Sequence, residues 1–536
     1  MALGIAWTTV ALGVWLRSRA VTTAPLWLDE ASWAMRLMDE PLSELVIRPP
    51  GFMFIERALA RAFSPSEGVL RFIPWLAGVG CVLLSVPLGR RLFRSEAARL
   101  LFVGLIALDP MAIELSKEFK PYSVSLTLHA SLMFLSLKYA ASGRTRELVG
   151  LLVLSVLAVL FAQDVLFAYP GIFILLAIDT FRARRLRHLA ATVVACALTL
   201  TVVGGLYHYV WSQLNQPKVE RRWGKKYDVF YVSGGSQTDW VLERYTGLVE
   251  TPTLRRLTWR PSKRISKKAV TELASSYAAV FLVLNIAGAL SLVRRKQWRE
   301  CVLLMLPLVV MLGFNLYGFW PFGAFRTNLF TVVYVAALAS AAVERAPLRT
   351  RALDFAPVAL LVFWPLFAFE KKWHATKKAA SLFPDAMREL VRLHGPPVPG
   401  HKDVLVGDGT YTCPMYKYYT MYHPVYSKTI GPQLLKTFNL NCRSDRIPAM
   451  INTARSSLRG PGDHVWMLFS RAAYFPQIPK PIEGDLHQFV WSMVGDMHII
   501  VGLERAHAAE PMTTPEAPAG PDEPAPVDEP EGSGMQ

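Results

Sequence analysis

The sequence predicts a mainly α, polytopic membrane protein: a transmembrane helical bundle of about 11 spans with a small C-terminal exported α/β domain. Two observations predict this fold class. Of the 536 residues, 52% are hydrophobic and only 18% are charged, with a mean hydropathy of +0.28, whereas a soluble chain carries about 25% charge. Long apolar runs also recur along residues 1–370, with short basic clusters between them. This composition excludes disorder for most of the chain and argues against one compact cytosolic enzyme.

A helix that crosses a bilayer needs about 20 mostly apolar residues. Runs that approach this length lie at 3–20, 69–90, 97–114, 121–139, 148–163, 165–181, 189–211, 273–293, 300–320, 327–345 and 353–370. The first run has no basic n-region and no Ala-x-Ala cleavage site, which favours a span over a signal peptide. Residues 1–370 are therefore predicted to form one transmembrane domain.

Clusters of arginine and lysine follow alternate spans and predict the orientation of the bundle. These clusters begin at Arg90, Lys138, Arg182, Arg294 and Arg345. All of them lie on one side if every run crosses the bilayer, and short basic loops stay cytoplasmic. The remaining loops then face outward. The outward loop 212–272 is long and basic, which is the main tension in this topology, although long loops translocate largely regardless of charge.

The chain carries a net charge of +17, from 58 basic and 41 acidic residues. Nucleic-acid binding would require these basic residues on one polar domain, but they are split among the loops between apolar runs. The charge therefore favours cytoplasmic loops and contact with anionic membrane lipids. We expect no nucleic-acid partner.

Beyond residue 370 the composition changes to that of a small folded domain. Short apolar runs at Val404–Val406, Val465–Phe469 and Ile499–Leu503 predict buried strands, and helical patterns lie at 385–394, 414–422 and 447–458. Alternating helices and strands predict an exported α/β domain over 375–505. Residues 507–536 are rich in Ala, Pro, Glu and Asp, so this tail is predicted to be disordered.

The 5 cysteines include no CxxC pair, which argues against a zinc knuckle or a redox motif. Cys413 and Cys442 are the only cysteines of the region 375–505. Disulfides persist on the outer side of a membrane, so a bridge between them is one interpretation. Two free buried thiols are the other, because the distance between two cysteines cannot be judged from a sequence.

The first outward loop contains the sequence Pro-Leu-Trp-Leu-Asp-Glu-Ala, in which Asp29 and Glu30 are adjacent. Acidic side chains suit the first turn of a helix, which gives them a structural interpretation. A carboxylate held beside a membrane could instead act as a general base. Arg48 and the pair Pro49-Pro50 follow, and the prolines are expected to begin a second interfacial segment.

Two further outward loops combine charge with aromatic residues. Glu114–Tyr122 reads Glu-Leu-Ser-Lys-Glu-Phe-Lys-Pro-Tyr, and Arg326 ends an aromatic loop that contains Trp-Pro-Phe-Gly. In one interpretation, Lys117 and Lys120 merely extend their ammonium groups to the membrane interface. In the other, they hold a lipid phosphate together with Tyr122. Arg326 breaks the positive-inside trend, and a guanidinium suits bidentate phosphate binding.

These motifs, in this order, resemble those of the GT-C glycosyltransferases over residues of about 20–370. Trp-x-Asp-Glu-Ala with the later Pro-Pro pair, Ser-Lys-Glu-x-x-Pro-Tyr and Trp-Pro-Phe-Gly-x-x-Arg carry the resemblance. It is strongest to the protein mannosyltransferase and aminoarabinose transferase-like branch of bacterial membranes. The resemblance implies a multi-pass protein of the bacterial inner (cell) membrane. It also implies a polyprenyl-phosphate sugar donor and inverting transfer on the outer face.

The resemblance also implies roles for individual residues. Asp29 takes the catalytic acidic position, with Glu30 as its catalytic or supporting neighbour. Residues in the donor-phosphate positions are Lys117, Lys120, Tyr122 and Arg326. Beside the resemblance, Arg48, Glu118 and Asp164 are candidate supporting residues. Two residues depart from the family's pattern: Arg48 replaces a His or small polar residue, and Lys117 replaces the commoner Arg. Both departures bear on the donor sugar and on the fine geometry of the site.

The chemistry explains these residue types independently. A sugar phosphodiester has a good leaving group if Lys or Arg meets its developing charge, and a carboxylate can deprotonate the attacking hydroxyl. The acceptor stays open among lipid, glycan and protein. The sequence requires no cofactor, because no spacing of Asp, Glu and His demands a metal ion. A divalent metal stays open, since Asp29, Glu30 and His residues could bind one.

Two other functions remain open from the sequence. A lipid-linked glycan polymerase or ligase shares the donor class, and loop 212–272 with Tyr227, Asp228 and Asp239 keeps it open. A lipid-linked sugar transporter would place ionisable residues near the midplane, and usually shows internal repeats. The candidate site residues fall at one face instead: Asp29, Glu30, Lys117, Glu118, Lys120, Asp164 and Arg326. His129, inside a span, is interpreted as a helix–helix hydrogen-bond partner.

Overall fold

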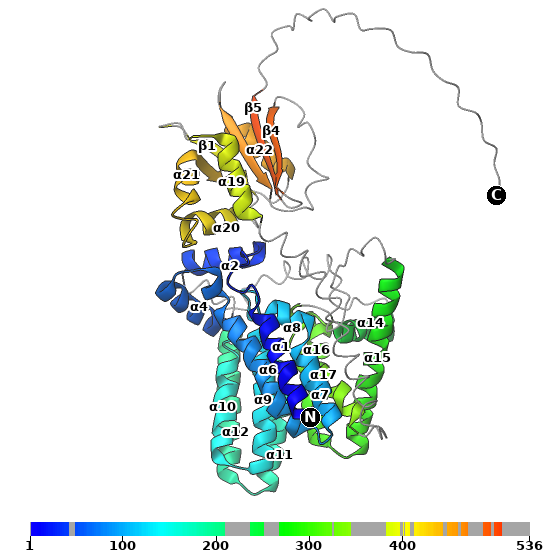
Figure 1. The fold of residues 1–536 in the computed structure, drawn as a ribbon. Coiled ribbons are helices and arrows are strands. Elements are labelled where there is room, and N and C mark those ends of the chain that lie inside the picture. Colours follow the sequence, from blue (N-terminus) through cyan, green and yellow to red (C-terminus); the bar gives the residue numbers. More distant parts are fainter. Residues whose placement is uncertain are drawn as a thin grey trace, which may run out of the picture.

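The computed structural model describes residues 2–41, 49–208, 236–250, 267–323, 326–344, 382–396, 400, 402–407, 412–442, 447–458, 463–469, 486–494 and 498–505. Within these residues the chain is mainly helical, as predicted. A bundle of helices forms one part and a five-stranded sheet with its helices forms the other (Figure 1). Arg48, the run 353–370, most of the loop 212–272 and the tail 507–536 lie outside the described residues.

Apolar runs of the predicted bundle fall on helices. These are α1 (Ala2–Ser18), α6 (Phe72–Leu92), α7 (Glu96–Ala107), α9 (Tyr122–Ser142), α10 (Thr145–Ala158), α11 (Tyr169–Arg182), α12 (Leu186–Leu206), α15 (Lys267–Arg294), α16 (Trp298–Leu316) and α17 (Thr331–Val343). Among the described residues, 4 helices are long and apolar enough to cross a membrane by themselves: α6, α9, α12 and α16. The total of about 11 spans therefore stays a prediction.

The predicted run 97–114 is not one continuous helix. The helix α7 ends at Ala107, and α8 (Pro110–Leu115) begins after a break. Asp109 caps α8, because its Oδ1 accepts a hydrogen bond of 2.6 Å from the Ala112 N–H. Pro110 occupies the first turn of α8, where its missing N–H costs nothing but where it prevents α7 from continuing. The break brings the charged loop 116–120 to the end of the bundle.

Two amphipathic helices lie between the bundle and the sheet (Figure 1). They are α2 (Leu28–Asp39) and α4 (Pro50–Phe63), followed by the short α5 (Glu67–Leu70). Helix α4 begins at Pro50, as the proline pair predicted. The Arg57 guanidinium joins the two helices, because it donates a 2.7 Å hydrogen bond from Nε to the Leu37 carbonyl of α2.

The sheet has the order β2-β1-β3-β5-β4. Its strands are β1 (Asp403–Gly407), β2 (Phe438–Asn441), β3 (His464–Phe469), β4 (Leu486–Val494) and β5 (His498–Arg505). Strand β1 runs parallel to β2 and β3, whereas β5 is antiparallel to β3 and β4. The three central strands are those predicted from the sequence. The two edge strands were not predicted, because β2 is short and polar and β4 contains several polar residues.

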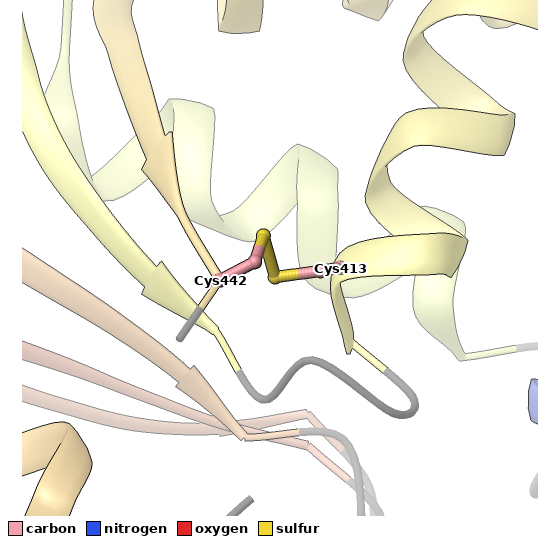
Figure 2. The surroundings of a disulfide bond; sticks show 2 residues. All are labelled: Cys413 and Cys442. Carbon is pink, nitrogen blue, oxygen red and sulfur yellow. A yellow bond between two sulfur atoms is a disulfide. The ribbon is translucent and has the colours of Figure 1, made fainter. Parts of the chain in front are cut away.

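The helices of this part are α19 (Phe383–His394), α20 (Thr412–Lys417), the π-helix η5 (Tyr418–Tyr422), α21 (Ile430–Thr437) and α22 (Ile447–Ser457). Helix α19 ends at Gly395, whose φ of +80° favours glycine. A disulfide joins Cys413 at the start of α20 to Cys442 just after β2, with a Cα–Cα distance of 6.0 Å (Figure 2). The bridge between these cysteines, which the sequence left open, is therefore present.

Candidate active site at the outward end of the bundle

Glu30 ties the first turn of α2 to two distant segments. It is only 1% exposed. Its Oε1 accepts hydrogen bonds from Arg71 Nε at 2.9 Å and from the Phe119 N–H at 2.6 Å. Its Oε2 accepts from Arg71 Nη2 at 2.7 Å and from the Trp27 N–H at 3.2 Å. Both oxygens are occupied by structural partners, so the geometry gives Glu30 a supporting role.

Arg71 is a site residue that was not predicted from the sequence. It lies between α5 and α6, is buried, and donates from Nη1 to the Ala24 carbonyl at 2.5 Å and from Nη2 to the Pro25 carbonyl at 3.1 Å. Together with Glu30 it fixes the chain that leads into α2. The sequence does contain a signal for Arg71. An arginine at the outward end of a span breaks the positive-inside trend, as Arg326 does.

Asp29 lies where the fixed α2 meets the loop 116–120. Its Oδ2 is 3.3 Å from Lys120 Nζ and 3.7 Å from Arg326 Nη2. The Asp29 side chain is 36% exposed, whereas that of Lys120 is 3% exposed. The structure therefore brings together one accessible carboxylate and two cations from loops that are far apart in the sequence.

Aromatic rings hold both cations in place. Lys120 Nζ lies 3.7 Å from the centroid of the Trp33 ring, and the Arg326 guanidinium lies 4.9 Å from that of the Trp27 ring. Trp33 follows Asp29 by one helical turn, so the two share a face of α2. Cation–π contacts of this kind contribute about 0.5–2 kcal/mol and restrict where the charge can lie.

Glu118 adds a second carboxylate to the group. Its Oε2 is 3.6 Å from Arg326 Nη1. Burial raises the pKa of the Glu118 carboxyl to about 8, although Arg326 opposes the shift. Burial likewise lowers the pKa of the Lys120 ammonium to about 8, although Asp29 favours the charged form. Two groups of opposite type therefore change protonation in the same pH range.

A cavity of about 220 Å³ opens beside this cluster. Its lining residues are Trp33, Pro49, Pro121, Tyr122, Ser125, Ala162, Gln163, Asp164, Trp320 and Thr327. Trp33 contacts Lys120 and also lines the cavity, so the charged cluster lies at its edge. Tyr122 and Asp164, which the sequence analysis selected, are thus joined to the site by a shared cavity.

Asp164 belongs to the inner part of this cavity. It lies in the 3-10 helix η1 (Gln163–Phe167), and its Oδ2 accepts a 2.5 Å hydrogen bond from the Ser125 hydroxyl. Its Oδ1 is 3.9 Å from Nε2 of His129. His129 Nδ1 is 2.7 Å from the Tyr334 hydroxyl of α17, which confirms His129 as a helix–helix hydrogen-bond partner.

The remaining predicted site residues lie as follows. Lys117 is buried in the turn that precedes Glu118. Arg48 lies outside the described residues, so nothing is added about its supporting position. Within the described part of the chain, no group of at least 3 His, Cys, Asp or Glu side chains is arranged to hold a metal ion.

The sheet part supports α2 from the side opposite the bundle. The Tyr418 hydroxyl donates a 2.8 Å hydrogen bond to the Pro65 carbonyl, and that of Tyr419 donates to the Leu26 carbonyl at 3.5 Å. His423 Nε2 is 3.1 Å from Glu67 Oε1. The segment that carries Asp29 is therefore held between the bundle and the helices α20 and η5.

Comparison with protein families gives one match. Residues 47–208 match the family described as dolichyl-phosphate-mannose-protein mannosyltransferase. This range contains Lys117, Lys120, Tyr122 and Asp164, whereas Asp29 and Arg326 lie outside it. No curated protein sequence matches the chain.

One solved structure shows the same fold, and two others match with lower scores. The crystal structure of ArnT from Cupriavidus metallidurans bound to undecaprenyl phosphate matches with a TM-score of 0.52 and 12% identity, over 94% of this chain and 98% of that one. The apo state of the same ArnT has a TM-score of 0.48 at 12% identity, again over 94% and 98%. An apo oligosaccharyltransferase from Archaeoglobus fulgidus has a TM-score of 0.39 at 14% identity, over 82% of this chain and 69% of that one.

Proposed function

We propose that the chain is a GT-C glycosyltransferase of the mannosyltransferase and ArnT-like branch, and that it transfers a sugar from a polyprenyl-phosphate donor to an acceptor hydroxyl. One observation carries the proposal. An accessible carboxylate, Asp29, lies within 4 Å of two cations at the edge of a cavity. The ArnT with the similar fold is bound to undecaprenyl phosphate in its crystal structure, which supports the donor class.

The reaction needs a base and a site for the leaving phosphate. The acceptor hydroxyl oxygen attacks the anomeric carbon as the bond from that carbon to the phosphate oxygen breaks, and the sugar configuration inverts. Asp29 accepts the hydroxyl proton, while Lys120 and Arg326 meet the negative charge that develops on the phosphate. The lipid phosphate leaves as the second product. Asp164 and Tyr122 contribute polar groups toward the sugar in the cavity.

The outer face of the membrane is the proposed side of transfer. Basic loops after α6, α9, α11 and α15 lie at the opposite end of the helices from Asp29, and short basic loops stay cytoplasmic. The sheet part, which contains the Cys413–Cys442 disulfide, shares the side of Asp29. A disulfide suits a compartment outside the cytoplasm. A lipid, glycan or protein hydroxyl could serve as acceptor there.

The first test uses purified protein, a panel of polyprenyl-phosphate sugars and the variant Asp29→Asn. The parent is expected to release lipid phosphate from one donor, and Asp29→Asn should lower turnover by about 10²-fold or more while donor binding persists. Glu96→Gln is the matched control, since Glu96 is an exposed carboxylate at the start of α7. Transfer by Asp29→Asn at the parent rate would refute the base assignment. Donor movement across vesicles without cleavage would indicate a transporter instead.

A further inference from the structure

A second cavity lies at the other end of the bundle. It has a volume of about 380 Å³. Its basic lining residues are Arg90, Arg91 and Arg299, its acidic ones are Asp179 and Glu300, and much of the remainder is apolar, including Leu137, Ile172, Leu175 and Leu303. None of these residues has a part in the proposed transfer reaction.

The two cavities lie at opposite ends of α9. Tyr122 at the start of α9 lines the first cavity, and Ala141 near the end of α9 lines the second. At 1.5 Å per residue these positions are roughly 28 Å apart along the helix, close to the thickness of the hydrocarbon core, about 30 Å. The second cavity therefore lies at the membrane interface on the side of the short basic loops.

The charges of this cavity are only partly balanced from within the protein. Arg299 Nη2 forms an ion pair of 2.5 Å with Asp179 Oδ1. The Arg91 guanidinium lies 5.3 Å from the centroid of the Phe134 ring. Among the described residues, neither Arg90 nor Arg91 forms an ion pair with a carboxylate, and both are exposed. Three guanidinium groups against two carboxylates leave an excess of one positive charge.

We propose that this cavity binds the headgroup of an anionic phospholipid from the cytoplasmic leaflet. The phosphodiester of such a lipid carries the one negative charge that balances the excess. Guanidinium groups suit phosphate oxygens because they donate paired hydrogen bonds. The apolar lining beside the arginines accommodates the glycerol and the first methylenes of the acyl chains.

The test compares lipid retention by the purified full chain in native mass spectrometry. Phosphatidylglycerol is added to the parent protein and to the variant Arg90→Gln/Arg91→Gln, with phosphatidylcholine as the neutral-headgroup comparison. Each basic residue near an anionic headgroup contributes roughly a five-fold gain in affinity, so the double variant should bind phosphatidylglycerol about 25-fold more weakly. Phosphatidylcholine should bind weakly to both proteins.

Matched variants separate a site from a general effect of charge. Arg94→Gln/Arg187→Gln removes the same charge from exposed residues at this end but outside the cavity, and should retain parent affinity. Arg90→Lys/Arg91→Lys keeps the charge but loses the paired hydrogen bonds, so its affinity should lie between those of the parent and the glutamine pair, which controls for misfolding. Equal weakening by both glutamine pairs would overturn the proposal. So would displacement of the lipid by millimolar inorganic phosphate, since that result would indicate a site for the free anion.

Discussion

At the residue scale, Asp29 and Glu30 have different roles although they are neighbours, because successive residues of a helix point about 100° apart. Asp29 faces Lys120 and Arg326, whereas Glu30 turns inward to Arg71. Glu30→Gln should therefore act mainly on stability. Removing one partner of a buried ion pair costs about 3–5 kcal/mol, because the other charge is left uncompensated.

Thermal unfolding in detergent measures this difference. Glu30→Gln is expected to lower the melting temperature strongly, whereas Asp29→Asn should lower it less, because Asp29 is 36% exposed and its buried partner Lys120 keeps its contact with the Trp33 ring. Arg71→Met is the reciprocal variant, and it should destabilise the protein similarly because it leaves Glu30 buried without its cation. A Glu30→Gln protein as stable as the parent would show that the Arg71 pair does not hold α2.

The pH dependence of transfer follows from Lys120 and Glu118. Below pH 8 Lys120 is charged and Glu118 is neutral; above pH 8 Lys120 loses its proton and Glu118 becomes negative. Both changes remove positive charge from the proposed phosphate site. Donor affinity should therefore fall as the pH rises through about 8.

A titration of the donor KM from pH 6 to about 10 checks this prediction. Lys120→Arg keeps its charge over this range, so the fall should become shallower, and the added change Glu118→Gln should remove the rest. A KM that rises equally in the parent and in Lys120→Arg/Glu118→Gln would assign the pH effect to other groups.

The sequence predicted the charged members of this site better than their supports. Asp29, Lys120 and Arg326 were found because charge at an outward span end is conspicuous, and the resemblance set them in one site. Trp33 and Arg71 were not found. Their roles depend on contacts between segments far apart in the chain. A single tryptophan near an interface has a common structural explanation, whereas Arg71 carried the same signal as Arg326 and was overlooked.

At the scale of elements, the Cys413–Cys442 disulfide fixes α20 to the end of β2. Helix α20 and η5 contact α2, so the bridge also supports the segment that carries Asp29. The bridge closes a loop with a sequence separation of 29, which corresponds to about 3.6 kcal/mol in the chain-entropy model.

Loss of this bridge should therefore lower stability more than catalysis. Cys413→Ala/Cys442→Ala is expected to reduce the melting temperature, with a smaller reduction in transfer measured well below that temperature. Reductant should destabilise the parent and have no effect on the double variant, which is the internal control. A parent protein that is insensitive to full reduction, verified by thiol alkylation, would contradict the expected contribution.

The elements themselves were predicted where hydrophobic periodicity is strong. The central strands β1, β3 and β5 were found because their residues are apolar and buried. The break between α7 and α8 was missed, because Asp109-Pro110 lies inside an otherwise apolar run and hydropathy does not respond to a single proline. The edge strands were also not predicted from hydropathy, since one side of an edge strand needs no apolar partner.

At the scale of the whole molecule, the two ends of the helical bundle carry different groups. The end at Tyr122 carries the carboxylate, the paired cations and the sheet part, and the end at Ala141 carries the basic loops. The position of the sheet part over α2 could not be predicted from the sequence. It depends on contacts such as Tyr419 with Leu26, at a separation of 393 residues.

This organisation makes a prediction about topology. Gly143 follows α9 on the side of the basic loops, whereas Gly395 follows α19 in the sheet part. The predicted spans place an odd number of crossings between these two glycines.

A phosphatase reporter fused after Gly395 should be active outside the cytoplasm, and the same reporter after Gly143 should be inactive. A cytoplasmic reporter should give the reverse pattern, which controls for expression. Activity of one reporter at both positions would require an even number of crossings, and would place Asp29 and the sheet part on the wrong side for transfer at the outer face.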